Sequence, residues 1–256
     1  MIYLKGFELF VFATLCVLIY IGIELAKRKV PYIRVFPALE HIEEAVGRAA
    51  EMGKPVHFST GLGGLHDEWA PVTTAALAIM GEVAKACGKY AVPMRYSCVR
   101  SYLVPVAEDL IKFGYETGGH PEMYDPDMIV YTGEEQRALM SSMMGYIMRE
   151  RPAVNMLFGA TKYETINFLG TGAIAGSMQF GGTPRLYYLP VMMATCDYCL
   201  VAEEVYAAGA AITREASQLG SIKGIDYFKF FILAFIIISV ILTTAGTDWF
   251  GKLIAL

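Results

Sequence analysis

The chain has 256 residues, of which 55% are hydrophobic and 18% charged, and its formal net charge at pH 7 is −4. This composition is more apolar than that of an ordinary soluble protein, and the apolar excess is concentrated at the two ends. Because the chain has no long basic run, we expect no nucleic acid partner.

The first apolar segment predicts a transmembrane helix at residues 7–25. Residues 9–23 carry no charge, and the whole segment approaches the length of a bilayer span. A secretory signal peptide is the competing interpretation. It is disfavoured because no small-residue cleavage site is present and the stronger basic cluster, at residues 27–29, follows the apolar stretch.

The region between the two ends alternates helices and strands. Residues 37–52 have the spacing of an amphipathic helix, with Pro37 suited to its first turn. Strands are expected at 56–59, 93–97, 128–131, 153–158 and 178–180, with 186–192 as a possible last strand. Further helices are expected at 72–89, 104–113, 134–151, 163–175 and 198–217. Such alternation predicts an α/β domain with a Rossmann-like, mostly parallel sheet and helices on both faces.

The second apolar segment predicts another transmembrane helix at residues 229–247, followed by a short outer tail at residues 248–256. One α/β domain, residues 30–225, lies between the two anchors. The only plausible linkers, residues 30–36 and 220–226, are short, so we expect this domain to stay close to the bilayer.

The distribution of basic residues predicts the orientation in the membrane. Only Lys5 and Lys252 flank the outer ends, whereas the domain side carries a larger set: Lys27, Arg28, Lys29, Arg34, Lys223 and Lys229. Positive residues mark the cytoplasmic side, so we expect a cytoplasmic domain in the cell (inner) membrane with both termini on the opposite side. The five cysteines fit that compartment as reduced thiols.

The loops after the predicted strands carry the candidate ligand site. In an open parallel sheet the carboxyl ends of the strands share one rim, where ligands usually bind. Glycines at this rim would let backbone N–H groups approach an anion such as a phosphate or carboxylate. The candidate ligand-binding residues are Ser59, Thr60, Gly61, Gly63, Gly64, Thr132, Gly133 and Thr161.

Each part of this candidate site also has a structural interpretation. The loop at residues 59–65 matches neither the dinucleotide nor the P-loop pattern, which favours a tight structural turn. The spacing of Thr132 to Glu135 and of Thr161 to Glu164 is that of capping boxes, which favours helix capping by the two hydroxyls.

Three further motifs favour structural roles. Residues 170–176 are glycine-rich but follow no strand, so close helix packing explains them better than a nucleotide loop. Cys196 and Cys199 form a C-x-x-C motif without further zinc ligands, which favours buried free thiols over a redox pair or metal site. His66, Asp67 and Glu68 follow the glycine loop and could supply acid or base, although solvated loop residues are the simpler reading. We predict no metal and no cofactor.

Residues 37–61 read PALEHIEEAVGRAAEMGKPVHFSTG, and residues 196–210 read CDYCLVAEEVYAAGA. These stretches resemble an uncharacterised prokaryotic membrane protein family that is defined only as a domain of unknown function. The resemblance covers most of the chain and implies two membrane anchors flanking an α/β domain. It implies a prokaryotic source but supplies no catalytic residues.

Two functional hypotheses follow. Two anchors, short linkers and no recognisable catalytic signature favour a non-enzymatic scaffold that assembles with copies of itself or decorates a larger membrane complex. The alternative is a membrane-anchored domain, with or without enzymatic activity, that binds a nucleotide or another anion with the loop at residues 59–65. A transporter-associated accessory subunit is a third interpretation.

Overall fold

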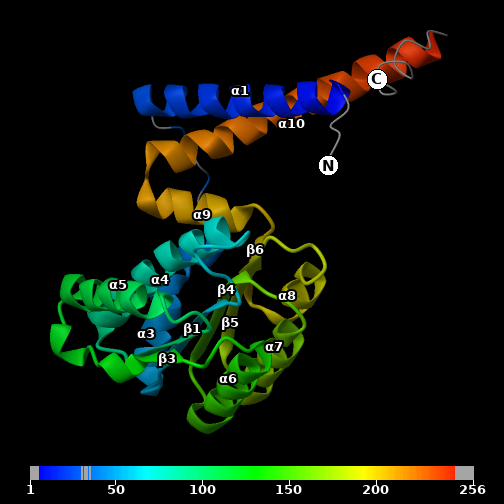
Figure 1. Cartoon of the computed structure of the whole chain (residues 1–256). Coiled ribbons are helices and arrows are strands. Elements are labelled where there is room, and N and C mark those ends of the chain that lie inside the picture. Colours follow the sequence, from blue (N-terminus) through cyan, green and yellow to red (C-terminus); the bar gives the residue numbers. More distant parts are fainter. Residues whose placement is uncertain (1–5, 30, 32–33, 35, 246–256) are drawn as a thin grey trace. The chain divides into compact units, whose positions relative to one another are not determined.

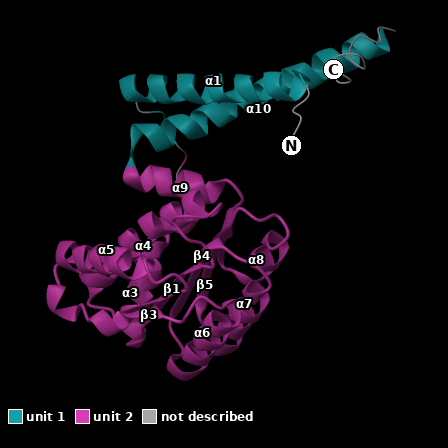
Figure 2. Cartoon of the chain, viewed as in Figure 1, with its two compact units in different colours: residues 1–33, 214–256 teal, residues 34–213 magenta. Residues whose placement is uncertain are grey.

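The computed structural model describes residues 6–29, 31, 34 and 36–245. The chain separates into two compact units, residues 34–213 and residues 1–33 with 214–256 (Figure 2). Several features expected from the sequence lie outside the described residues: the outer tail at 248–256, the last two residues of the second predicted anchor, Val30, Lys5 and Lys252.

The central unit contains a six-stranded sheet in which every strand pair is parallel. The strand order is β3-β2-β1-β4-β5-β6. The strands are β1 (Val56–Gly61), β2 (Met94–Cys98), β3 (Ile129–Tyr131), β4 (Val154–Ala160), β5 (Met178–Thr183) and β6 (Tyr198–Val201). This confirms the predicted α/β class, and the order reverses direction between β1 and β4, the topological switch point of a doubly wound sheet.

Helices cover both faces of this sheet (Figure 1). On one face lie α3 (Ile42–Met52), α4 (Ala70–Tyr90), α5 (Leu103–Gly118) and α9 (Glu204–Thr213), which pack through α4. On the other lie α6 (Gln136–Glu150), α7 (Glu164–Ala175) and α8 (Leu189–Thr195). Three short elements complete the unit: α2 (Pro37–Glu40), η1 (Pro121–Met123) and η2 (Pro126–Met128). Covering helices explain why β1 and β4 are buried along their whole length.

The structure corrects the predicted end of this unit. The expected strand at 186–192 is wrong, because Pro190 lies in the first turn of α8, where its fixed φ suits a helix start. The expected helix at 198–217 is also wrong at its beginning. Tyr198–Val201 instead forms β6, which pairs with β5 and extends the sheet by one strand. Aromatic and β-branched residues in this segment suit a strand.

A row of polar side chains crosses the middle of the sheet. Arg95, His57, Asn155 and Gln179 occupy matching positions on β2, β1, β4 and β5, and we call these four residues the polar row. The His57 ring is 3.0 Å from Asn155 Oδ1 and 3.0 Å from Ser97 Oγ. Asn155 donates to Gln179 Oε1 at 3.4 Å. Hydrogen bonds between neighbours therefore compensate His57, Asn155 and Gln179 for their burial, whereas the buried Nε of Arg95 has no hydrogen-bond partner among the described residues.

The other unit contains α1 (Gly6–Arg28) and α10 (Ala216–Thr244), both long and apolar enough to cross a membrane. Residues 220–226, expected as a linker, lie inside α10. The helices are antiparallel, since Phe7 stacks on Phe235 while Gly22 contacts Gly220 and Gly224. Glycine is required at these crossings because a Cβ on Gly22 would overlap the backbone of α10.

This pairing offsets the uncharged stretches of the two helices. Asp226 forms ion pairs with Lys223 at 3.5 Å and with Lys229 at 3.6 Å. These three residues lie between the α10 positions that contact Gly22 and Phe7, and therefore beside the uncharged part of α1. Two apolar helices are consistent with association with a bilayer, while the transmembrane topology remains a prediction.

Candidate functional site

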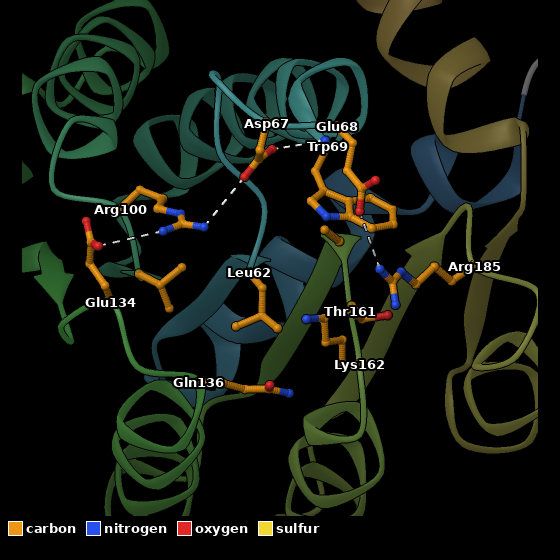
Figure 3. A pocket seen from close by; sticks show the side chains of 12 residues that line it. Leu62, Asp67, Glu68, Trp69, Arg100, Glu134, Gln136, Thr161, Lys162 and Arg185 are labelled. Atoms are coloured by element: carbon orange, nitrogen blue, oxygen red, sulfur yellow. Dashed lines mark hydrogen bonds and ion pairs between the residues drawn. The ribbon is translucent and has the colours of Figure 1, made fainter. Parts of the chain in front are cut away.

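A pocket of about 360 Å³ lies at the carboxyl edge of the sheet (Figure 3). Its lining includes Leu62 after β1 and Ala160 and Thr161 at the end of β4, so it lies at the topological switch point. We call it the switch-point pocket. Its volume is at the lower end of the range of about 300–1,000 Å³ that is usual for small-molecule sites.

Three basic residues line the switch-point pocket, and each follows a strand by two residues. Arg100 follows β2, which ends at Cys98, and Lys162 follows β4, which ends at Ala160. Arg185 follows β5, which ends at Thr183. Because the carboxyl ends of parallel strands meet at one edge, this shared spacing brings together side chains from distant parts of the chain.

Arg100 is held by two carboxylates at distances longer than hydrogen bonds. Its guanidinium is 3.6 Å from Asp67 and 3.8 Å from Glu134. Its Nε is buried and has no hydrogen-bond partner among the residues that the structure describes. A guanidinium carries five N–H donors, so Arg100 retains donor capacity for a ligand.

Arg185 is held by an aromatic ring. Its guanidinium carbon lies 4.0 Å from the centroid of the Trp69 ring, and its nearest carboxylate, Glu68, is 3.9 Å away. A cation–π contact uses the flat face of a guanidinium and leaves the N–H groups at its edge available. Trp69 therefore orients Arg185 without saturating its donors.

Lys162 is anchored through its backbone. The Lys162 N–H donates to Glu164 Oε1 at 2.7 Å, and the same buried carboxylate accepts a hydrogen bond from Gln136. Glu164 is the first residue of α7, where the helix dipole favours a negative charge. The Lys162 ammonium forms no ion pair within the described residues, so it adds a positive charge that no carboxylate of the lining contacts directly.

Asp67 organises the loop between β1 and α4. Its Oδ1 accepts hydrogen bonds from the Trp69 N–H at 2.9 Å and the Gly64 N–H at 3.3 Å, while Oδ2 faces Arg100. The Asp67 carboxylate thus fixes the loop that carries Trp69 and also forms an ion pair with the Arg100 guanidinium. Asp67 therefore has a positioning role, and Trp69 and Arg100 depend on it.

Four backbone N–H groups of the glycine loop, those of Gly61, Leu62, Gly64 and Leu65, are already engaged inside the protein. The Gly61 N–H donates to Ser59 Oγ at 3.1 Å, the Leu62 N–H to the Ala160 carbonyl at 2.8 Å and the Leu65 N–H to the Tyr102 hydroxyl at 3.3 Å. These groups are not free to cradle an anion. The geometry is that of a tight turn. This turn needs a positive φ at Gly61, which is 68° and which glycine adopts without strain.

The other glycines of this loop permit close packing. A Cβ on Gly63 would meet the Thr73 hydroxyl, and one on Gly64 would meet the Tyr102 hydroxyl. Substitution of Gly63 by Ala would therefore test packing of the loop and not ligand binding.

The two hydroxyls expected on this loop are buried and internally bonded. Ser59 donates to the Ser97 carbonyl at 2.8 Å, and Thr60 lies 2.8 Å from the Tyr96 hydroxyl. Neither residue lines the switch-point pocket. Of the eight candidate ligand-binding residues, only Thr161 is part of its lining, so the ligand-binding role of the other seven remains a prediction without support from the pocket.

The capping boxes expected at Thr132 and Thr161 are wrong. The two helices begin later, at Gln136 and Glu164, and no side chain caps either start. Thr132 donates to the Cys98 carbonyl at 3.1 Å, while Thr161 donates to the Thr183 hydroxyl at 3.2 Å. Both hydroxyls tie neighbouring strand ends together. Gly133 has a φ of 89° and open space around it.

The sequence profile of the family described as Domain of unknown function (DUF6754) matches residues 3–254. The chain belongs to this family. Membership confirms the resemblance drawn from residues 37–61 and 196–210, and it carries no activity with it. No curated protein and no solved structure matches the chain, so any function for this DUF6754 member has to be argued from its own residues.

Sequence reasoning missed the three basic residues of this DUF6754 pocket, whose lining also holds three acidic residues. Arg100, Lys162 and Arg185 belong to no motif, and the predicted ends of their strands were one to three residues short. The usable signal was their common place, two residues after a strand. Asp67 and Glu68 were noted as a possible acid or base, and both line the pocket, whereas the adjacent His66 is exposed and its ring contacts the Tyr102 ring at a tilted angle.

The cysteine motif lies elsewhere in the unit. Burial raises the pKa of Cys196 to about 12 and that of Cys199 to about 11, which opposes the thiolate that redox chemistry needs. No group of three or more potential metal ligands occurs among the described residues. In the glycine-rich segment, Gly172 is inside α7, where a Cβ would meet the side chains of Asn155 and Gln179.

Proposed function

We propose that this protein is a membrane-associated α/β domain that binds a small anionic molecule in the switch-point pocket. The single observation that carries the proposal is the convergence of Arg100, Lys162 and Arg185 on one pocket at the edge of the sheet. Guanidinium and ammonium groups recognise phosphates and carboxylates through charge-assisted hydrogen bonds.

The unsaturated state of these donors supports the proposal. The ion pairs of Arg100 and Arg185 measure 3.6–3.9 Å, beyond the usual hydrogen-bond range of about 2.7–3.2 Å. Buried or half-buried donors without good acceptors are costly, and an incoming anion would supply those acceptors. Side chains, and not the backbone of residues 59–65, would make the primary contacts.

Thermal unfolding of the full chain in a neutral maltoside detergent tests this proposal, with phosphate, diphosphate, succinate and citrate as probes at constant ionic strength. At least one probe should stabilise the protein, because a ligand that binds only the folded state raises its stability. Arg100→Gln should abolish this stabilisation. Arg137→Gln should leave it unchanged, because Arg137 is exposed and outside the pocket lining. Equal behaviour of these two variants would contradict the proposal.

A cytoplasmic position of the domain is part of this proposal. The charges of Lys27, Arg28 and Lys29 at the end of α1 support it, because positive residues are retained on the cytoplasmic side. Both termini would then lie on the opposite side of the cell (inner) membrane. Reporter fusions to the two termini test the topology, and a cytoplasmic signal from either terminus would contradict it. Removal of α1 as a signal sequence would be recognised from the mass of the mature chain.

Self-assembly as a scaffold is a second candidate function. The segment from the end of β5 into α8 exposes three large apolar side chains, those of Leu186 (69%), Tyr187 (89%) and Met193 (61%). Such exposure favours an interface with copies of this chain or with another membrane protein. Light scattering of the gently solubilised protein, with the detergent mass subtracted, tests this candidate. A monomer without partner polypeptides would rule it out.

A further inference from the structure

We infer that the ligand of the switch-point pocket carries two anionic groups, one bound by Arg100 and the other by Arg185, and that Glu134 and Glu68 hold these arginines until the ligand displaces them. This inference rests on the proposed function and names the class of ligand and the competition that controls its binding.

The topology separates the two arginines. Arg100 follows β2 and Arg185 follows β5, and β1 and β4 lie between these strands in the sheet. Neighbouring strands are about 4.8 Å apart, so the two strand ends are separated by roughly 14 Å. Figure 3 shows the two arginines on opposite sides of the pocket, with Thr161 and Lys162 between them.

Each arginine also contacts a different side chain on its own side of the pocket. Asp67, in the loop before α4, forms the shorter of the two Arg100 ion pairs, at 3.6 Å, and the Trp69 ring packs on Arg185. A single small anion would therefore satisfy one arginine or the other. A ligand with two separated anionic groups would satisfy both and place its middle near Thr161 and Lys162.

The carboxylates of Glu134 and Glu68 are more exposed to solvent than that of Asp67. The side chains of Glu134 and Glu68 are 59% and 76% exposed, whereas the guanidinium-bearing side chains of Arg100 and Arg185 are 31% and 26% exposed. Asp67 is 28% exposed and holds two backbone N–H groups, so it stays in place. Loose, solvent-screened pairs contribute little, and a ligand that forms short bidentate hydrogen bonds to the arginines would replace them.

The polar and apolar parts of the pocket limit the size of the ligand. Leu62, Val99 and Ala160 contribute an apolar surface, while Gln136, Thr161 and Lys162 contribute polar groups. A volume of about 360 Å³ suits a compact diphosphate or dicarboxylate metabolite. The ligand class is therefore a small soluble molecule with anionic groups at both ends.

The first experiment measures the binding of phosphate, diphosphate and triphosphate as a length series. The full chain is used in maltoside at constant ionic strength, in a Trp249→Phe background that leaves Trp69 as the fluorescent reporter. Thermal unfolding is followed in parallel. The best of the longer anions should bind at least about tenfold more tightly than phosphate, because it adds a second charge-assisted contact.

The arginine variants test whether the ligand contacts Arg100 and Arg185 at the same time. Arg100→Gln or Arg185→Gln alone should remove the advantage of the longer anions, while Arg137→Gln should retain it. An advantage that survives in both pocket variants would reflect charge alone and would overturn the two-ended inference. Unfolding midpoints near that of the parent protein show that the variants are folded.

The glutamate variants test displacement. Glu134→Gln and Glu68→Gln should each tighten binding of the longer anion about two- to fivefold, as expected for the loss of one exposed competing ion pair. Glu135→Gln is the matched control, since Glu135 is exposed and outside the pocket lining. Equal affinities in all three variants would overturn the displacement mechanism.

The outcomes separate this inference from the proposed function. If none of the three phosphates, and neither succinate nor citrate, binds to the wild type, both proposals fail. If phosphate and the longer anions bind equally well and Arg100→Gln weakens them equally, the anion pocket stands and the two-ended ligand is rejected.

Discussion

The polar row lies within neighbouring parallel strands in the middle of the sheet, whereas the basic side chains of the switch-point pocket lie in loops that follow strand ends at its edge. In the row, the His57 ring has partners at 3.0 Å on both sides. In the pocket, the arginine ion pairs are 3.6–3.9 Å long. Polar groups that satisfy one another stabilise the fold, while polar groups that remain unsatisfied at an accessible edge are available to a ligand.

The cause of this difference is the geometry of the sheet. Within the strands, parallel pairing sets His57 and Asn155 side by side at a fixed spacing, so their side chains meet at hydrogen-bond distance. Beyond the strand ends, each loop follows its own path and the side chains diverge. Their remaining donors can then converge on a third molecule.

The largest effect is expected from breaking the polar row at Asn155. Asn155→Leu removes one hydrogen-bond partner of His57 and one of Gln179 while keeping a similar volume. Buried polar groups without partners cost about 1–3 kcal/mol each, so the unfolding midpoint should fall by roughly 10 °C. Arg100→Gln, which removes only loose ion pairs, should cost less than about 1 kcal/mol. Thermal unfolding of both variants makes the comparison, and equal shifts would contradict it.

The second effect concerns the pH dependence that His57 gives to stability. Burial lowers the pKa of His57 to about 4, assisted by the positive charge of Arg95 and opposed by the hydrogen bond with Asn155. The His57 ring is therefore protonated near pH 6.5 in the unfolded chain but only near pH 4 in the folded protein. Stability is fully present above pH 6.5 and is lost as the pH falls toward 4, by up to about 3 kcal/mol.

A variant that cannot be protonated isolates this contribution. His57→Gln should have lower stability at pH 7 but a shallower decline between pH 6.5 and 4, measured by chemical unfolding at a series of pH values. Parallel curves for the wild type and the variant would show that His57 does not carry the effect.

The last prediction concerns the reactivity of the C-x-x-C motif, whose thiols, like the polar row, are largely enclosed by the protein. With the pKa of Cys199 raised to about 11 and that of Cys196 to about 12, their thiolate fractions near pH 8 are very small. Alkylation by iodoacetamide should be about 100-fold slower than for an ordinary thiol with a pKa of about 8.5. A Cys16→Ser variant removes the exposed cysteine of α1 from the assay. Rapid labelling or ready oxidation to a disulfide would contradict this expectation.

Several parts of the fold could be read directly from local patterns. Short apolar strands alternating with helices predicted the parallel sheet, and Pro37 was recognised at a helix start. The last strand could not be placed, because Tyr198–Val201 is short and carries the same kinds of residue as the helix that follows it. Its pairing with β5, which no local pattern contains, decides its conformation.

The candidate site also has parts that the sequence predicted and parts that only the tertiary structure decided. The sequence by itself determined that ligands would be sought at the carboxyl edge of the sheet, that residues 59–65 form a glycine turn, and that two apolar helices bracket the domain. Only the tertiary structure decided that Thr132 and Thr161 tie strands together and that the basic side chains after three different strands share one pocket. The physical reason is that hydrogen bonding and hydrophobic periodicity along a segment are local, whereas the meeting of Arg100, Lys162 and Arg185 depends on the order in which the strands pair.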